Sequence, residues 1–309
     1  MAAAGFAAEL ARHGPAGTSG RAAPSLDESF AYCRRLAKTH YENFVVASRL
    51  LPRRLRQHFA NVYAYCRWSD DLADETSTPE ESLALLEWWE GQLDDCFAGR
   101  ATHPVFVALG QTVREFDIPP KPFHDLLSAF RRDQTVQRYE TFAELLDYCR
   151  RSANPVGRLV LYLGRVHDDE RGELADSICT GLQLANFWQD VAEDRRRGRV
   201  YIPLEDCRRF GIGEADFAAA EAIAAFQRLM EYEVARAEEW LRAGLPLVDR
   251  LPGWLAGDIW LIAQGGLTIL DKIRAVQFDV CTRRPKVSRW DQTKLLTGYL
   301  VRRIAAGRR

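Results

Sequence analysis

The apolar residues of this chain recur with helical spacing from Leu26 almost to the C-terminus, and this pattern constrains the fold more than any other feature. No stretch shows the convincing alternation of apolar and polar residues that a strand requires, and no hairpin signal is present. We predict helices at Leu26–Leu50, Pro52–Asp74, Pro79–Phe97, Pro104–Phe116, Lys121–Arg132, Phe142–Leu163, Asp169–Arg195, Ala215–Ala243, Trp254–Phe278 and Ser288–Ala306. The sequence therefore predicts an all-α protein, and one domain over residues 26–309 is its simplest organisation.

The first 25 residues are rich in alanine, glycine and proline. They lack the basic start and the sustained apolar run of a signal peptide. Because such a composition buries little apolar surface, we predict that residues 1–25 form a disordered tail outside the folded domain.

The composition limits where the protein is expected to be located and what it is expected to bind. The net charge of −1 gives no indication of nucleic-acid binding. Seven cysteines without a Cys-x-x-Cys pair favour reduced thiols in a cytoplasmic protein. The most apolar stretch, Trp254–Leu270, is interrupted by Asp258 and Gln264 and falls short of the ~20 apolar residues that cross a bilayer.

Two pairs of aspartates stand four residues apart within predicted helices, Asp70 with Asp74 and Asp190 with Asp194. Like charges at this spacing repel by roughly 0.2–0.5 kcal/mol per pair. The first pair shares one helical stripe with Tyr63, Arg67 and Asp71, and the second shares a stripe with Gln183 and Asn186. A single such pair is usually part of a solvated helix face, but two pairs beside amides and arginines favour a binding site.

Carboxylate and amide oxygens without histidine or cysteine select a hard cation, Mg²⁺ or Mn²⁺. Mg²⁺ prefers one or two carboxylates together with substrate phosphates. We therefore predict that the two aspartate pairs lie on facing helices and hold a diphosphate through bridging metal ions.

The segments "YAYCRWSDDLADE" and "GLQLANFWQDVAEDRRRGRVYIP" resemble the two aspartate-rich motifs of squalene and phytoene synthases. The resemblance covers about Leu26 to Ala306. It implies an isoprenoid-synthase-type helical bundle with a central cavity and a Mg²⁺-dependent reaction of prenyl diphosphates.

The resemblance also assigns roles to single residues. It implies metal binding by Asp70, Asp74, Asn186, Asp190 and Asp194. It implies substrate contacts from His40, Tyr63, Arg67, Gln183, Arg199 and Tyr201, with the last two on a flap, and it places Tyr148 beside a developing cation. For His40, a purely structural role is an equal alternative.

A finer similarity is to the hydroxysqualene synthases of bacterial hopanoid biosynthesis, carried by "HYENFVVASRLLPRRLRQHFANVYAYCRWSDDLADE" and "YCRRSANPVGRLVLYLG". It implies ionisation of presqualene diphosphate, rearrangement of the cation and capture of water, without NADPH. Where the wider family usually has VAGxVG, this chain has SANPVG, Ser152 to Gly157, which we interpret as a more polar turn that shapes the pocket.

A carbocation requires an apolar pocket with aromatic faces. Phe44, Tyr148, Phe187 and Trp188 are candidates, although any single aromatic residue is more often part of the core. Either the departing diphosphate or Tyr148 acting through a water is a candidate general base, and the sequence does not choose between them. We also hypothesise peripheral association with the inner membrane surface, beside other enzymes of squalene biosynthesis, because the substrate is a lipid.

Two alternatives remain, and the sequence argues against a third. The same aspartates suit the head-to-head condensation of two prenyl diphosphates to presqualene diphosphate, squalene or phytoene. A non-enzymatic helical adaptor would show no dependence on metal. A di-iron bundle requires Glu-x-x-His on inward faces, and no histidine here has glutamate three residues before it.

Overall fold

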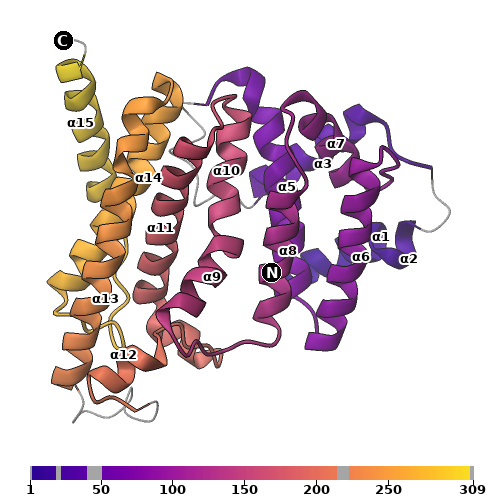
Figure 1. The fold of residues 1–309 in the computed structure, drawn as a ribbon. Helices are drawn as coiled ribbons and strands as arrows, with labels where there is room; N and C mark the ends of the chain where they lie inside the picture. Colours follow the sequence, from indigo (N-terminus) through magenta and orange to yellow (C-terminus); the bar gives the residue numbers. More distant parts are fainter. Residues whose placement is uncertain (1, 19–21, 40–50, 214–222, 307–309) are drawn as a thin grey trace. The chain divides into compact units, whose positions relative to one another are not determined.

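The structure, a computed structural model, describes residues 2–18, 22–39, 51–213 and 223–306. Over these ranges every regular element is a helix, apart from an isolated bridge between Arg138 and Val200 (Figure 1). The predicted all-α fold is confirmed. The chain divides into two compact units, Met1–Thr135 with Leu159–Val166, and Val136–Arg158 with His167–Arg309. Each unit is described by itself, and a single domain over residues 26–309 stays a prediction.

The first unit is built from consecutive helices of the N-terminal part of the chain. These are α1 (Ala2–His13), α2 (Pro15–Thr18), α3 (Leu26–Thr39), η2 (Arg53–Leu55), α5 (Arg56–Asp74), α6 (Pro79–Phe97), α7 (Pro104–Glu115) and α8 (Lys121–Asp133). The end of α10 (Asn154–Leu163) also belongs to this unit. Proline begins α6 and α7 as predicted, and Thr78 caps α6 by accepting a hydrogen bond from the backbone N–H of Glu81.

The N-terminal residues differ from the predicted disordered tail, because residues 2–18 form α1 and α2. The ring of Phe6 is buried and lies edge-on to Trp68, with 5.3 Å between the ring centroids. Glu9 accepts a hydrogen bond of 2.8 Å from the hydroxyl of Tyr32 on α3. The alanine-rich segment has high helix propensity, and these two contacts supply the tertiary packing that composition did not reveal.

An aromatic core fixes the rotation of α5 about its axis. Trp68 stacks on Trp89 of α6 at 5.2 Å, and its indole N–H donates to the Tyr32 hydroxyl at 2.9 Å. The indole N–H of Trp89 donates to the Ser69 hydroxyl at 3.0 Å. Because Trp68, Ser69 and Leu72 are all buried, the helix turns Asp70 and Asp74 away from this core.

The second unit holds the remaining helices. They are α9 (Phe142–Ser152), the start of α10, α11 (Asp169–Arg196), α12 (Leu204–Arg209), α13 (Ile223–Gly244), η5 (Leu245–Arg250), α14 (Gly253–Ala275) and α15 (Arg289–Ala306). The predicted helix Phe142–Leu163 is divided at Ala153. Pro155 has no N–H to donate to the preceding turn, which explains the division. Between the predicted helices Asp169–Arg195 and Ala215–Ala243 lies a helix that the sequence did not predict, α12.

Helices α11 and α13 pack closely through a glycine. A Cβ on Gly181 would lie 2.7 Å from the backbone nitrogen of Leu241 and 3.1 Å from the carbonyl oxygen of Ala237. The buried indole of Trp188 donates its N–H to the backbone carbonyl of Glu233 at 3.1 Å. Trp188 is therefore a core residue that holds α11 against α13, not a pocket aromatic.

None of the described helices combines the length and hydropathy that a membrane-spanning segment requires. All seven cysteines are free, as the sequence predicted.

Phe6→Ala tests whether α1 is part of the folded unit. Loss of the buried ring removes its contact with Trp68, so we expect the free energy of unfolding to fall by about 3 kcal/mol. Urea unfolding measures this change, and limited proteolysis reports the release of α1. Ala7→Ser, at an exposed position of the same helix, is the control and should leave both measurements unchanged. Equal stability of the two variants would show that α1 does not pack on the core.

Asp258→Asn tests a buried carboxyl of α14. Burial raises the pKa of Asp258 to about 7, and its Oδ1 atom accepts no hydrogen bond. Since the unfolded pKa is near 4, the folded state binds an extra proton between pH 4 and 7, and the free energy of unfolding falls as pH rises through this window. The variant should gain up to ~4 kcal/mol relative to wild type between pH 4 and 8, measured by urea unfolding.

The matched control for this comparison is Asp271→Asn, an exposed aspartate of the same helix. The control should follow the pH dependence of the wild type. If Asp258→Asn also follows it, the buried carboxyl does not take up the proton.

Candidate functional site

The first aspartate motif lies on the last two turns of α5 in the first unit. Tyr63 and Asp70 are partly buried and Asp74 is exposed. Asp71 is the most buried acid of the motif, with 9% of its side chain exposed. The carboxylates of the motif therefore differ in exposure, from Asp71 at the edge of the core to Asp74 in solvent.

Arg67 is the cation that balances these acids. Its Nε donates to Asp71 at 3.1 Å, its Nη2 forms a second contact with the same carboxylate, and its Nη1 lies 3.3 Å from Asp70. One guanidinium thus serves two carboxylates. The structure shows that these two carboxylates hold the Arg67 side chain, and its predicted contact with the substrate stays a prediction.

Two carboxyls of this motif, Asp70 and Asp71, hold their protons more tightly than free aspartate. Burial raises the pKa of Asp70 to about 6, and the nearby Asp74 carboxylate adds to the rise. Burial also raises the pKa of Asp71 to about 6, although Arg67 opposes it. Both shifts disfavour the charged carboxylate, which a bound cation would stabilise.

The second motif lies near the end of α11 in the second unit. Asn186 is exposed, whereas Gln183, Asp190 and Asp194 are partly buried. Burial raises the pKa of Asp194 to about 6, and the Asp190 carboxylate contributes to the rise. A partly buried aspartate with a raised pKa therefore occurs at both predicted motifs.

Arg284 is a residue that the sequence analysis missed. It follows α14, 94 positions after Asp190, and forms a two-pronged ion pair with that carboxylate, Nε to Oδ1 at 2.5 Å and Nη2 to Oδ2 at 2.9 Å. Its Nε also lies 3.7 Å from Glu193. The arginine is adjacent to Arg283 in a short basic run, and no local pattern distinguishes the two.

The segment that carries Arg199 and Tyr201 is anchored by backbone hydrogen bonds within the second unit. The N–H of Val200 donates to Gln137 at 2.9 Å, and the N–H of Leu204 donates to Tyr139 at 3.0 Å. Gly198 has a positive φ of 79°, which permits the chain to turn directly after α11. The segment predicted to be a flap is therefore hydrogen-bonded through its backbone to residues 137–139.

Four aromatic rings gather beside this segment. Tyr201 stacks on Phe187 at 3.8 Å and on Tyr139 at 5.8 Å, and Tyr148 lies 6.2 Å from Phe187 and 6.0 Å from Tyr201. Tyr139 was not predicted, because it stands in a polar loop before α9. The rings present several π faces in one place, an arrangement that suits stabilisation of a cation.

A small pocket connects these rings to the second motif. It is lined by Phe187, Asp194, Arg199 and Tyr201 among others, and its volume is about 10 Å³. This is room for about one water molecule, not for a prenyl chain. The pocket brings three predicted site residues together in the second unit.

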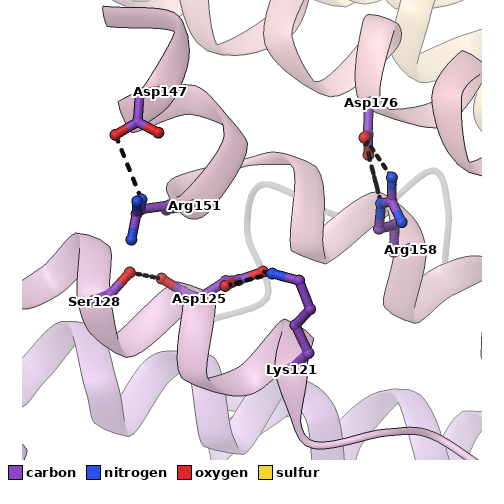
Figure 2. Close-up of polar contacts among 7 residues, drawn as sticks. All are labelled: Lys121, Asp125, Ser128, Asp147, Arg151, Arg158 and Asp176. Carbon is purple, nitrogen blue, oxygen red and sulfur yellow. Dashed lines mark hydrogen bonds and ion pairs between the residues drawn. The ribbon is translucent and has the colours of Figure 1, made fainter. Parts of the chain in front are cut away.

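The polar turn at Ser152–Gly157 serves packing. Asn154 is buried, and its Oδ1 accepts a hydrogen bond of 3.0 Å from the Thr180 hydroxyl on α11. Arg158 forms a two-pronged ion pair with Asp176, also on α11 (Figure 2). The prediction that this turn shapes the pocket stays a prediction. His40 and Phe44 lie outside the described residues.

The carboxylate and amide oxygens of the two motifs suit a divalent cation that takes few ligands from the protein. Over the described residues, no three His, Cys, Asp or Glu side chains are close enough together to hold a metal. Each motif instead offers an aspartate pair in which burial raises the pKa of one member, Asp70 on α5 and Asp194 on α11, and α11 adds the Asn186 amide. Mg²⁺ binds in this way, through one or two carboxylates together with water and phosphate oxygens.

Comparison with known proteins gives a consistent result. The model of the squalene/phytoene synthase family matches residues 37–291. A phytoene synthase of Arthrospira platensis is 31% identical over 289 residues, which cover 89% of this chain and 94% of the relative. A 15-cis-phytoene synthase of Synechocystis is also 31% identical, over 87% of this chain and 83% of the relative.

Two solved structures share the fold. The squalene synthase HpnC of Alicyclobacillus acidocaldarius is 43% identical, with a TM-score of 0.79 over 82% of this chain and 95% of that one. A dehydrosqualene synthase solved with a ligand is 27% identical, with a TM-score of 0.80 over 91% of this chain and 98% of that one. On the match of the family model and these similarities, the chain belongs to the squalene/phytoene synthase family.

Proposed function

We propose that the chain is a Mg²⁺-dependent hydroxysqualene synthase that converts presqualene diphosphate and water into hydroxysqualene and diphosphate. Family membership makes it a squalene/phytoene synthase-type enzyme of isoprenoid biosynthesis. The single observation that supports the finer proposal best is the 43% identity to a squalene synthase named HpnC, above the 31% identity to the phytoene synthases described above. The SANPVG turn, which departs from the usual family sequence, adds to this support.

In this proposal the aspartate pairs hold the diphosphate end of the substrate. Asp70 and Asp74 of α5, with Asn186, Asp190 and Asp194 of α11, would bind Mg²⁺ (Mn²⁺ as a substitute). The bound cations would neutralise charge on the departing diphosphate. Arg67 and Arg199 would add guanidinium contacts to phosphate oxygens, and Tyr63, Tyr201, Gln183 and His40 would complete the substrate contacts.

The aromatic cluster would hold the hydrocarbon cation. The C–O bond to diphosphate breaks, and both electrons leave with the oxygen. The cyclopropylcarbinyl cation rearranges beside the rings of Tyr148, Phe187 and Tyr201, whose faces attract positive charge. A water oxygen then bonds to the cation and loses a proton, so that no hydride and no NADPH are consumed.

The proposal includes a cellular location for the enzyme. The enzyme would act at the cytoplasmic face of the membrane, beside the enzymes that make its substrate and use its product.

The second candidate function is the head-to-head condensation of two prenyl diphosphates. The 31% identity to phytoene synthases over most of both chains favours it. Product analysis distinguishes the two reactions.

Mass spectrometry of products, after incubation of the pure protein with presqualene diphosphate and Mg²⁺ without NADPH, tests the function. We expect an alcohol with the mass of hydroxysqualene, and no product after chelation of the metal. Asp70→Asn and Asp190→Asn should each lower kcat by at least about a hundredfold, because each removes a carboxylate at a place where charge develops.

Asp125→Asn is the matched control. Asp125 also lies on a helix of the first unit and pairs at i,i+4, but its partner is Lys121 (Figure 2). The control should keep full activity. A hydrocarbon product, or condensation of farnesyl diphosphate with no reaction of presqualene diphosphate, would contradict the proposal in favour of the second candidate.

Arg284→Gln tests the partner of Asp190. The arginine neutralises this carboxylate, so it competes with any cation that Asp190 would bind. We expect the variant to bind Mg²⁺ several-fold more tightly than wild type in isothermal titration calorimetry without diphosphate. The neighbouring Arg283→Gln is the control: Arg283 lies 4.0 Å from Asp279, and its substitution should leave the affinity for Mg²⁺ unchanged. Equal affinities of the two variants would remove Arg284 from the site.

A further inference from the structure

Helix α15 carries an apolar outer face. Trp290 is 78% exposed, Leu300 is 58% exposed and Leu296 is 43% exposed. Only Leu26 and Val156 share this property among the large hydrophobic side chains that the structure describes, and each stands alone on another helix. The exposed apolar surface is therefore gathered on one helix.

The opposite face of α15 is attached to α14 of the same unit. Tyr299 is buried, its ring lies 5.8 Å from that of Trp260, and its hydroxyl donates to the carbonyl of Gly253 at 3.3 Å. Asp291 forms an ion pair of 2.9 Å with Lys272. These contacts fix the rotation of the helix, so the exposed apolar side chains have no route into the core.

The outer face is also basic. Arg289 and Lys294 are exposed beside the apolar residues, and the only acid of the helix, Asp291, is held by Lys272 and by the hydroxyl of Ser288. In the sequence of residues 281–309, nine lysines and arginines accompany this one acid, whereas the whole chain has a net charge of −1. Positive charge is therefore concentrated at this end of the chain.

We propose that the outer face of α15 docks on the surface of an anionic lipid bilayer. An exposed tryptophan and leucines with flanking lysine and arginine are the composition of a helix that lies in a membrane interface. Anionic lipid supplies the opposite charge. A symmetric contact between two copies would bring these like charges together, which disfavours a second copy as the occupant. The inference is independent of the proposed reaction.

Vesicle co-sedimentation with the full chain tests the docking. We expect the protein to pellet with vesicles of phosphatidylcholine and 30% phosphatidylglycerol, to stay soluble with phosphatidylcholine alone, and to be released by salt. The double variants Trp290→Ser with Leu300→Ser, and Arg289→Glu with Lys294→Glu, should each weaken binding by about tenfold or more.

Two controls are matched to these variants. Leu26→Ser removes an exposed leucine that stands alone on α3, and Arg53→Glu with Arg54→Glu reverses the charge of two exposed arginines of the first unit. Both should bind like wild type. Binding that is equal for all variants, or equal for the two lipid compositions, would overturn the proposal.

Two further measurements distinguish membrane docking from misfolding of a variant and from self-association of the chain. Brominated phosphatidylglycerol should quench the emission of wild type more than that of Trp290→Phe, and equal quenching would contradict the docking. Sedimentation velocity without lipid should give the same mass for wild type and for Trp290→Ser with Leu300→Ser. A lower mass for the variant would show that the face joins copies of the chain.

Discussion

Two pairs of aspartates one helical turn apart, each with one member ion-paired to an arginine, are the constraint on which the proposed site depends. On α5, Arg67 contacts both Asp70 and Asp71. On α11, Arg284 contacts Asp190. Burial raises the pKa of Asp70 and of Asp194 to about 6, and the neighbouring aspartate carboxylate of each pair adds to the rise. A divalent cation would stabilise the charged form of these carboxylates.

The hydrophobic core of each unit determines where these acids point. Trp68 and Ser69 hold α5 against α6 through stacking and a hydrogen bond to Trp89. Trp188 holds α11 against α13 through the carbonyl of Glu233. Each anchor lies within a few residues of an aspartate pair, so we expect a change in core packing at Trp68 or Trp188 to move the carboxylates as well as to lower stability.

Sequence periodicity predicted the helices well because most of them have one apolar and one polar face. It predicted the paired aspartates for the same reason, since residues four apart share a face. It missed Arg284 and Tyr139, whose roles come from contacts across the fold, 94 positions from Asp190 in the case of Arg284. Periodicity also did not predict that α1 is an ordered helix, because its order depends on the contact between the Phe6 and Trp68 rings.

A crystal structure of the protein with Mn²⁺ and inorganic diphosphate, with the manganese located by its anomalous scattering, tests the central claim most directly. We predict manganese ions coordinated by Asp70 or Asp74 of α5 and by Asp190 or Asp194 of α11, with diphosphate oxygens bridging the ions. Manganese on only one motif, or an aspartate pair that faces bulk solvent without an ion, would contradict it.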